Sequence, residues 1–80
     1  MTNHEKLQEL LEDILLLDDG DYNLDLHRDA VETWDSMATV AIAIGIEEVF
    51  HHHPLEEEAI GLESVRHIVA FLEGKGVSFD

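Results

Sequence analysis

The 80-residue chain has no cysteine, one proline and only four lysine or arginine residues. Without cysteine it can form neither a disulfide framework nor a thiolate metal site, so any thiol would have to come from an added cofactor. Nineteen acidic residues oppose the four cations, giving a formal net charge of -15. This charge disfavours nucleic acid and anionic membrane surfaces as partners, and it suits proteins that present basic patches.

Long hydrophobic runs are also lacking. No apolar stretch is long enough to cross a bilayer, and the beginning MTNHEK does not resemble a signal peptide. We therefore expect a cytoplasmic protein. Eighty residues suffice for one domain with a small core, so we expect residues 1–80 to form a single domain. The hydrophobic share of 45% is enough for such a domain to fold. We also expect the protein to be a monomer.

Apolar residues recur at helical spacing near both ends of the chain. Near the beginning, Thr2 and Glu5 fit a capping box before a stripe of leucine and isoleucine, and residues 18–20 are expected to end this helix. Near the other end, Ser64 can cap a helix that Gly74 and Gly76 terminate. Between them we expect a short helix over 55–61 with Ile60 pointing inward, and after them a frayed tail over 77–80.

The longest uncharged run, residues 37–46, follows the helix-capping residues Asp35 and Ser36. It predicts a helix from Asp35-Ser36 to about His51. The β-branched residues of this run alternate with small ones, which would also fit a strand. A strand of this length without a partner strand cannot satisfy its backbone, so helix is favoured. The predicted fold is all-α, with four helices, a long first loop over 18–33 and a short third helix.

The central helix resembles the second helix of the acyl carrier protein family. The shared pattern is Asp35-Ser36-Met37, then Thr39-Val40, then Ile46-Glu47-Glu48 and Phe50. The resemblance extends over essentially the whole chain and implies the four-helix carrier-protein bundle. It implies that Ser36, preceded by Asp35, carries a phosphopantetheine arm through a phosphodiester, and that the arm holds acyl or aminoacyl groups as thioesters.

The resemblance also implies partners and excludes catalysis by the chain itself. The partners would be a phosphopantetheinyl transferase that uses coenzyme A, a ligase that loads the arm, and downstream synthase enzymes. Met37 and the pair Thr39-Val40 are similar to D-alanyl carrier proteins, and a polyketide or specialised acyl carrier is equally compatible. Independently of the family, a serine at a helix start lies where an attached phosphate is favoured. The plainer alternative is that Ser36 is only a helix cap.

A helical wheel divides the central helix into a core face and an opposite face. The core face holds Thr39, Ala43, Ile46 and Phe50, and the opposite face holds Met37, Ala41, Ile44 and Glu48. Carriers of fatty-acid synthesis usually have acidic residues early on the exposed face, where this chain has Ala38 and Ala41. We expect the opposite face to bind partner enzymes beside Ser36, although alanine is also simply a good helix former.

Calcium binding is the alternative function. The long loop places acidic and amide residues at the ligand positions of a twelve-residue calcium loop, namely Asp21, Asn23, Asp25, Asp29 and Glu32. The sixth position, however, is Leu26 instead of the glycine that the turn requires, and no second such loop is present. The run 51–53 of three histidines lacks the i, i+4 spacing of a metal site. An enzyme is the least expected class, because no base and nucleophile are paired at recognisable spacing.

Overall fold

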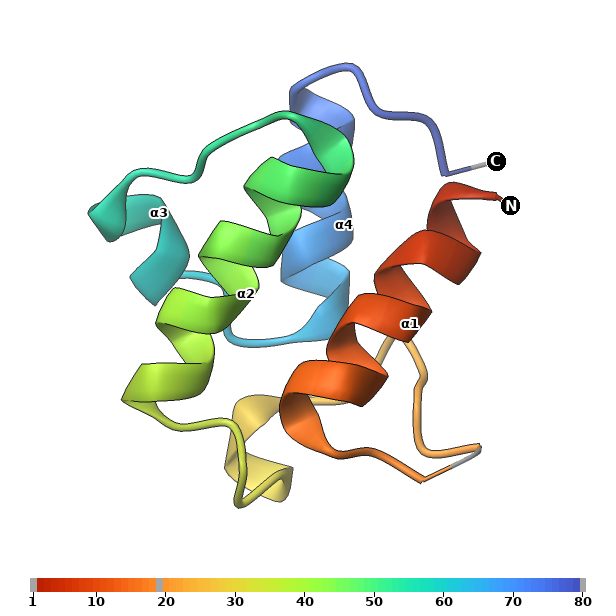
Figure 1. The fold of residues 1–80 in the computed structure, drawn as a ribbon, viewed down its shortest axis with the longest axis vertical. Helices are drawn as coiled ribbons and strands as arrows, with labels where there is room; N and C mark the ends of the chain where they lie inside the picture. The colour runs from red at the N-terminus through yellow and green to blue at the C-terminus, as the bar shows by residue number, and fades with distance from the viewer. Residues whose placement is uncertain (1, 19, 80) are drawn as a thin grey trace.

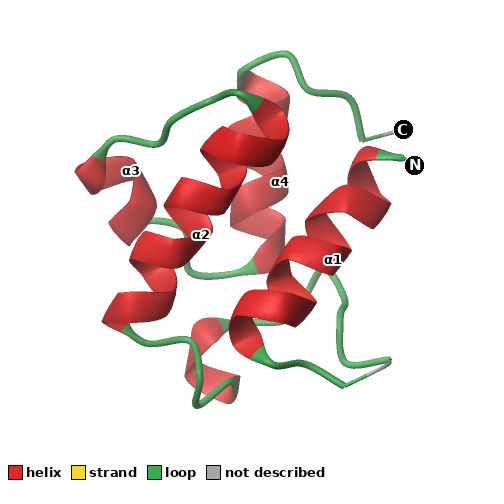
Figure 2. Cartoon of the chain, viewed as in Figure 1, coloured by secondary structure: helices red, strands yellow, loops and turns green. Residues whose placement is uncertain are grey.

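The structure, a computed structural model, describes residues 2–18 and 20–79 of the chain. These residues form α1 (Asn3–Leu15), a 3-10 turn η1 (Arg28–Ala30), α2 (Ser36–Phe50), α3 (Glu56–Ile60) and α4 (Val65–Gly74). Figure 2 shows no strand in the part described; one isolated bridge pairs His27 with Ser64. The all-α prediction with a long first loop and a short third helix is confirmed, and the strand alternative for the central run is wrong.

One apolar core lies among α1, α2 and α4. Figure 1 shows α1 and α2 side by side, with α4 behind them and α3 on the side of α2 away from α1. Each buried side chain of Val, Leu or Ile contributes about 1.5–3 kcal/mol to the free energy of folding. The most deeply buried side chains of the three helices are Leu7, Leu11, Leu15, Ile42, Ile46, Val65, Ile68 and Leu72. Within the described residues, no helix has the length and apolar character needed to span a bilayer.

Helix α1 begins with the predicted capping box. Thr2 Oγ1 accepts from the Glu5 backbone N–H, and Glu5 Oε1 accepts from the Thr2 N–H, both at 3.1 Å. The hydrogen bonds from Thr2, the backbone one first, lower the pKa of Glu5. The helix ends earlier than predicted, because Leu16 adopts the left-handed conformation (φ 56°) and donates its N–H to the Glu12 carbonyl. Asp19, part of the predicted stop at 18–20, lies outside the described residues.

The long first loop is fastened to the beginning of α4 by backbone hydrogen bonds. The Arg28 N–H donates to the Glu63 carbonyl at 2.9 Å, and the Val65 N–H donates to the Leu26 carbonyl at 3.0 Å. Leu26 and Val31 pack against the core as anchors of the loop. Leu24, in the same loop, is exposed and does not anchor it through its side chain. Its contribution is a backbone carbonyl that accepts from Arg66.

Two predictions about the second half of the chain are wrong. Ile60 is 58% exposed instead of pointing inward, since the buried Ala59 and Pro54 already occupy the inner side of α3. The tail is packed instead of frayed: Phe79 is 8% exposed and lies 6.1 Å from the Phe50 ring centroid. Asp80, the last residue of the predicted tail, lies outside the described residues.

Candidate functional site

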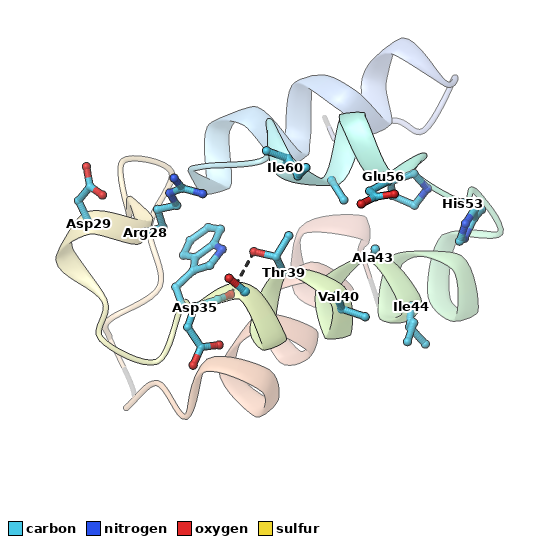
Figure 3. A pocket seen from close by; sticks show the side chains of 14 residues that line it. Arg28, Asp29, Asp35, Thr39, Val40, Ala43, Ile44, His53, Glu56 and Ile60 are labelled. Atoms are coloured by element: carbon cyan, nitrogen blue, oxygen red, sulfur yellow. Dashed lines mark hydrogen bonds between the residues drawn. The ribbon is translucent and has the colours of Figure 1, made fainter.

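Ser36 is the first residue of α2, as predicted, and Asp35 is its cap. Asp35 Oδ1 accepts from the Ala38 N–H at 2.9 Å, while its backbone carbonyl accepts from Thr39 Oγ1 at 3.1 Å (Figure 3). Ser36 is exposed, and its hydroxyl makes no hydrogen bond within the described residues. The simple alternative, in which Ser36 acts as the cap, is therefore wrong. The hydroxyl is left accessible because its neighbour performs the capping.

The environment of Ser36 favours a bound or attached anion. Ser36 lies at the positive end of the dipole of α2, a helix of 15 residues. The backbone N–H groups of the first helical turn point outward toward any group placed there. The Asp35 carboxylate uses the Ala38 N–H. The N–H groups of Ser36 and Met37 have no partner among the described residues.

A cavity of about 770 Å³ opens beside Ser36, between η1, α2 and α3 (Figure 3). Its apolar wall comes mainly from α2 and α3, and its polar groups lie toward the two ends. The apolar lining is Trp34, Val40, Ala43, Ile44, Pro54, Ala59 and Ile60; the polar lining is Arg28, Asp29, Asp35, Ser36, Thr39, His53 and Glu56. The cavity could not be predicted from the sequence, because η1, α2 and α3 meet only in the folded chain.

Trp34 lines this cavity and also holds a buried hydrogen-bond donor without a partner in the described part of the chain. Its side chain is 5% exposed, and its Nε1 is buried without a partner in the part of the chain described. A buried donor without an acceptor is unfavourable, typically by about 1–3 kcal/mol. Among the described residues, the other buried side-chain polar atom without a partner is the Tyr22 hydroxyl, whose pKa is raised by burial and which does not line the cavity.

Charged residues mark both ends of the cavity. Arg28, from η1, lines the cavity together with Asp35 and Ser36 (Figure 3). At the other end, His53 Nδ1 lies 2.9 Å from Glu47 Oε2, and Glu56 is the first residue of α3. The end near Ser36 thus carries Arg28 together with the acidic Asp29 and Asp35, the middle is apolar, and the other end carries His53 and Glu56.

The predicted partner-binding face of α2 is largely exposed. Met37 is 82% exposed and Ile44 50% exposed, Glu48 is also exposed, and Ala41 is partly buried. Of the predicted core face, Ala43, Ile46 and Phe50 are buried and Thr39 is partly buried. Two further exposed apolar residues, Val40 of α2 and Ile60 of α3, enlarge the apolar surface beside Ser36.

Ala38 does not lie on the exposed face, contrary to the comparison with fatty-acid carriers. It is buried in the core with Ile42, one helical turn further along α2. Residues four apart lie on the same side of a helix, so the stripe that buries Ile42 also buries Ala38. An acidic residue at position 38 would therefore carry its charge into the core.

The loop proposed for calcium does not gather its side chains. Asn23 Oδ1 accepts from the Asp25 N–H at 2.9 Å, and Asp25 Oδ1 accepts from Arg66 Nη2 at 2.8 Å. Asp29 lies beside His27, with Oδ2 3.6 Å from Nδ1. Asp21 and Glu32 are exposed. Across residues 2–18 and 20–79, no three acidic or histidine side chains are placed to hold a metal ion.

Comparisons with the models of known protein families, with characterised proteins and with solved structures gave no match.

Proposed function

We propose that the protein is a carrier that holds acyl or aminoacyl groups as thioesters on a phosphopantetheine arm attached to Ser36. The supporting observation is the accessible Ser36 hydroxyl, which Asp35 frees from capping, at the positive end of α2 and at the edge of a cavity. A separate transferase would attach the arm from coenzyme A. The chain would present the loaded arm to its partner enzymes and perform no catalysis itself.

The residues around Ser36 fit such an arm. Once attached, the arm supplies the thiol that a chain without cysteine lacks. Asp35 fixes the first turn of α2, whose N–H groups stabilise the charge of the phosphodiester. The apolar wall from Val40, Ala43 and Ala59 can cover the carried group and keep water from it.

The direct test is the intact mass of the protein after incubation with coenzyme A and a phosphopantetheinyl transferase of broad specificity. The mass should increase by one phosphopantetheine per chain. Protein that folds normally but gains no mass under conditions that modify a known carrier would contradict the proposal.

The exposed face of α2 should bind the partner enzymes. We expect Met37→Glu or Ile44→Glu to raise the transferase's KM for the carrier about 10- to 100-fold, because burying one such side chain contributes about 1.5–3 kcal/mol. Both side chains are at least half exposed, so the variants should remain folded. The matched control is Leu16→Glu, which changes another exposed apolar residue, 77% accessible, at the end of α1. A KM unchanged in the α2 variants, or raised equally by Leu16→Glu, would exclude this face as the docking surface.

Calcium binding, the alternative function, predicts a different response to divalent cations. In a chain of charge -15, carboxylates repel one another, and screening by any cation should raise Tm. Under the carrier proposal we expect calcium and magnesium to raise Tm alike, and Asp21→Asn combined with Asp25→Asn to keep most of the gain. Thermal unfolding in matched concentrations of the two chlorides measures this. A calcium-selective gain that disappears in the double variant would favour the alternative.

A further inference from the structure

Arg28 is held firmly at the cavity by the backbone. It begins η1, and its N–H donates to the Glu63 carbonyl at 2.9 Å, which joins η1 to the segment before α4. Its side chain is half-buried and lines the same cavity as Ser36 (Figure 3). Because η1 is fixed in this way, Arg28 is kept at the edge of the cavity.

Arg28 forms no ion pair within the described residues, although acidic residues greatly outnumber basic ones in the chain. Its sequence neighbour Asp29 is directed instead toward His27, at 3.6 Å, with a largely exposed carboxylate. Arg66, by contrast, pairs with Asp25 at 2.8 Å. An arginine that stays unpaired in so acidic a protein, beside a cavity, is available to an anion that is not part of the polypeptide.

We propose that Arg28 binds the phosphodiester of the arm on Ser36; this inference rests on the proposed function. The guanidinium offers several N–H donors in a plane that matches two phosphate oxygens, and such charge-assisted pairs are strong and directional. The phosphate would then be bound from two sides, by Arg28 and by the first turn of α2.

Trp34, two positions before Ser36, lines the same cavity, while its Nε1 is buried away from it. A phosphodiester bound by Arg28 directs the arm along the cavity between α2 and α3 instead of straight into solvent. Arg28 is therefore a binding residue for the arm, and it sets the direction in which the arm leaves Ser36.

The contact can be observed directly by NMR. In protein labelled with nitrogen-15, the Arg28 Nε–Hε resonance should shift when the unmodified protein is converted to the arm-bearing form, and the Arg66 resonance should stay in place. Inorganic phosphate added to the unmodified protein at one equivalent should not reproduce the shift. An Arg28 resonance that does not move on modification, or that moves equally with free phosphate, would overturn the inference.

Stability gives an independent measurement. Attaching the arm should change Tm less favourably in Arg28→Gln than in the wild type. The two changes in Tm should differ by about 2–5 °C, as expected for one partly screened ion pair in a domain of this size. Arg66→Gln, which removes the same charge from the pair with Asp25, should leave the difference unchanged. Equal effects of the two variants would show a general charge effect and overturn the proposal.

Intact mass separates the two possible failures. If neither wild type nor variants gain an arm, the proposed function fails. If all gain an arm and the responses of Arg28 and Arg66 are the same, the carrier function stands and the role of Arg28 is wrong.

Discussion

Replacing Ser36 with alanine should abolish uptake of the phosphopantetheine arm completely, while Ser78→Ala keeps one arm per chain. Ser36 combines an accessible hydroxyl with the positive end of a long helix, and Asp35 leaves that hydroxyl free by capping α2 itself. Ser78 is exposed but precedes no helix, so it is the matched control. Intact mass after incubation with coenzyme A and transferase gives the result, and circular dichroism confirms that both variants are folded.

Ser64 is a stricter control than Ser78, because it also lies at the beginning of a helix, α4. Its side chain is 7% exposed, and its Oγ accepts from the His67 N–H at 3.1 Å, so its hydroxyl is used as the cap of α4. Ser64→Ala should lose about 1 kcal/mol of stability through the missing cap and still accept one arm. Modification that persists in Ser36→Ala would show that the attachment site is elsewhere.

Phe79→Ala should destabilise the domain by about 3 kcal/mol, a large fraction of the stability of a small domain. The Phe79 ring is buried against Phe50, and it meets the His4 ring edge-on at 4.9 Å between centroids. Nearby, Asn3 Nδ2 donates to the Ser78 carbonyl at 2.7 Å, which fixes the backbone of the tail beside α1. Urea denaturation followed by far-ultraviolet circular dichroism gives the free energy of unfolding.

The exposed Ser78 provides a control for this experiment as well. Ser78→Ala changes the adjacent position and should alter stability by less than about 0.5 kcal/mol. A loss of the same small size in Phe79→Ala would mean that the tail contributes nothing to the core, as a frayed end would.

Local signals in the sequence were sufficient to predict the helices. Capping residues act within one helical turn, so Thr2, Asp35 and Ser64 correctly marked the beginnings of α1, α2 and α4. Ile60 was placed wrongly because α3, with five residues, is too short to show a repeating apolar stripe. Phe79 was misjudged because its partners His4 and Phe50 come from distant parts of the chain.

The candidate site was predictable only in part, for the same reason. Ser36 and Asp35 are adjacent and carry their own helix-start signal. Arg28 lies at the cavity because its backbone N–H donates to the distant Glu63 carbonyl. The cavity itself forms only because α3 lies beside α2. The sequence offered one clue, the single tryptophan directly before Asp35. An indole is a large apolar group that gains free energy from burial, and in the fold it is buried and forms part of the cavity wall.

The backbone hydrogen bonds between the first loop and the beginning of α4 affect the order in which the molecule can assemble. They join segments separated by about half of the chain, so they form only after a long loop has closed, at an entropic cost that rises slowly with its length. Helices α1 and α2 can contact each other early, while η1 reaches its final place only when the segment ahead of α4 arrives. A nascent chain emerging from the ribosome would therefore expose Ser36 before the cavity beside it is complete.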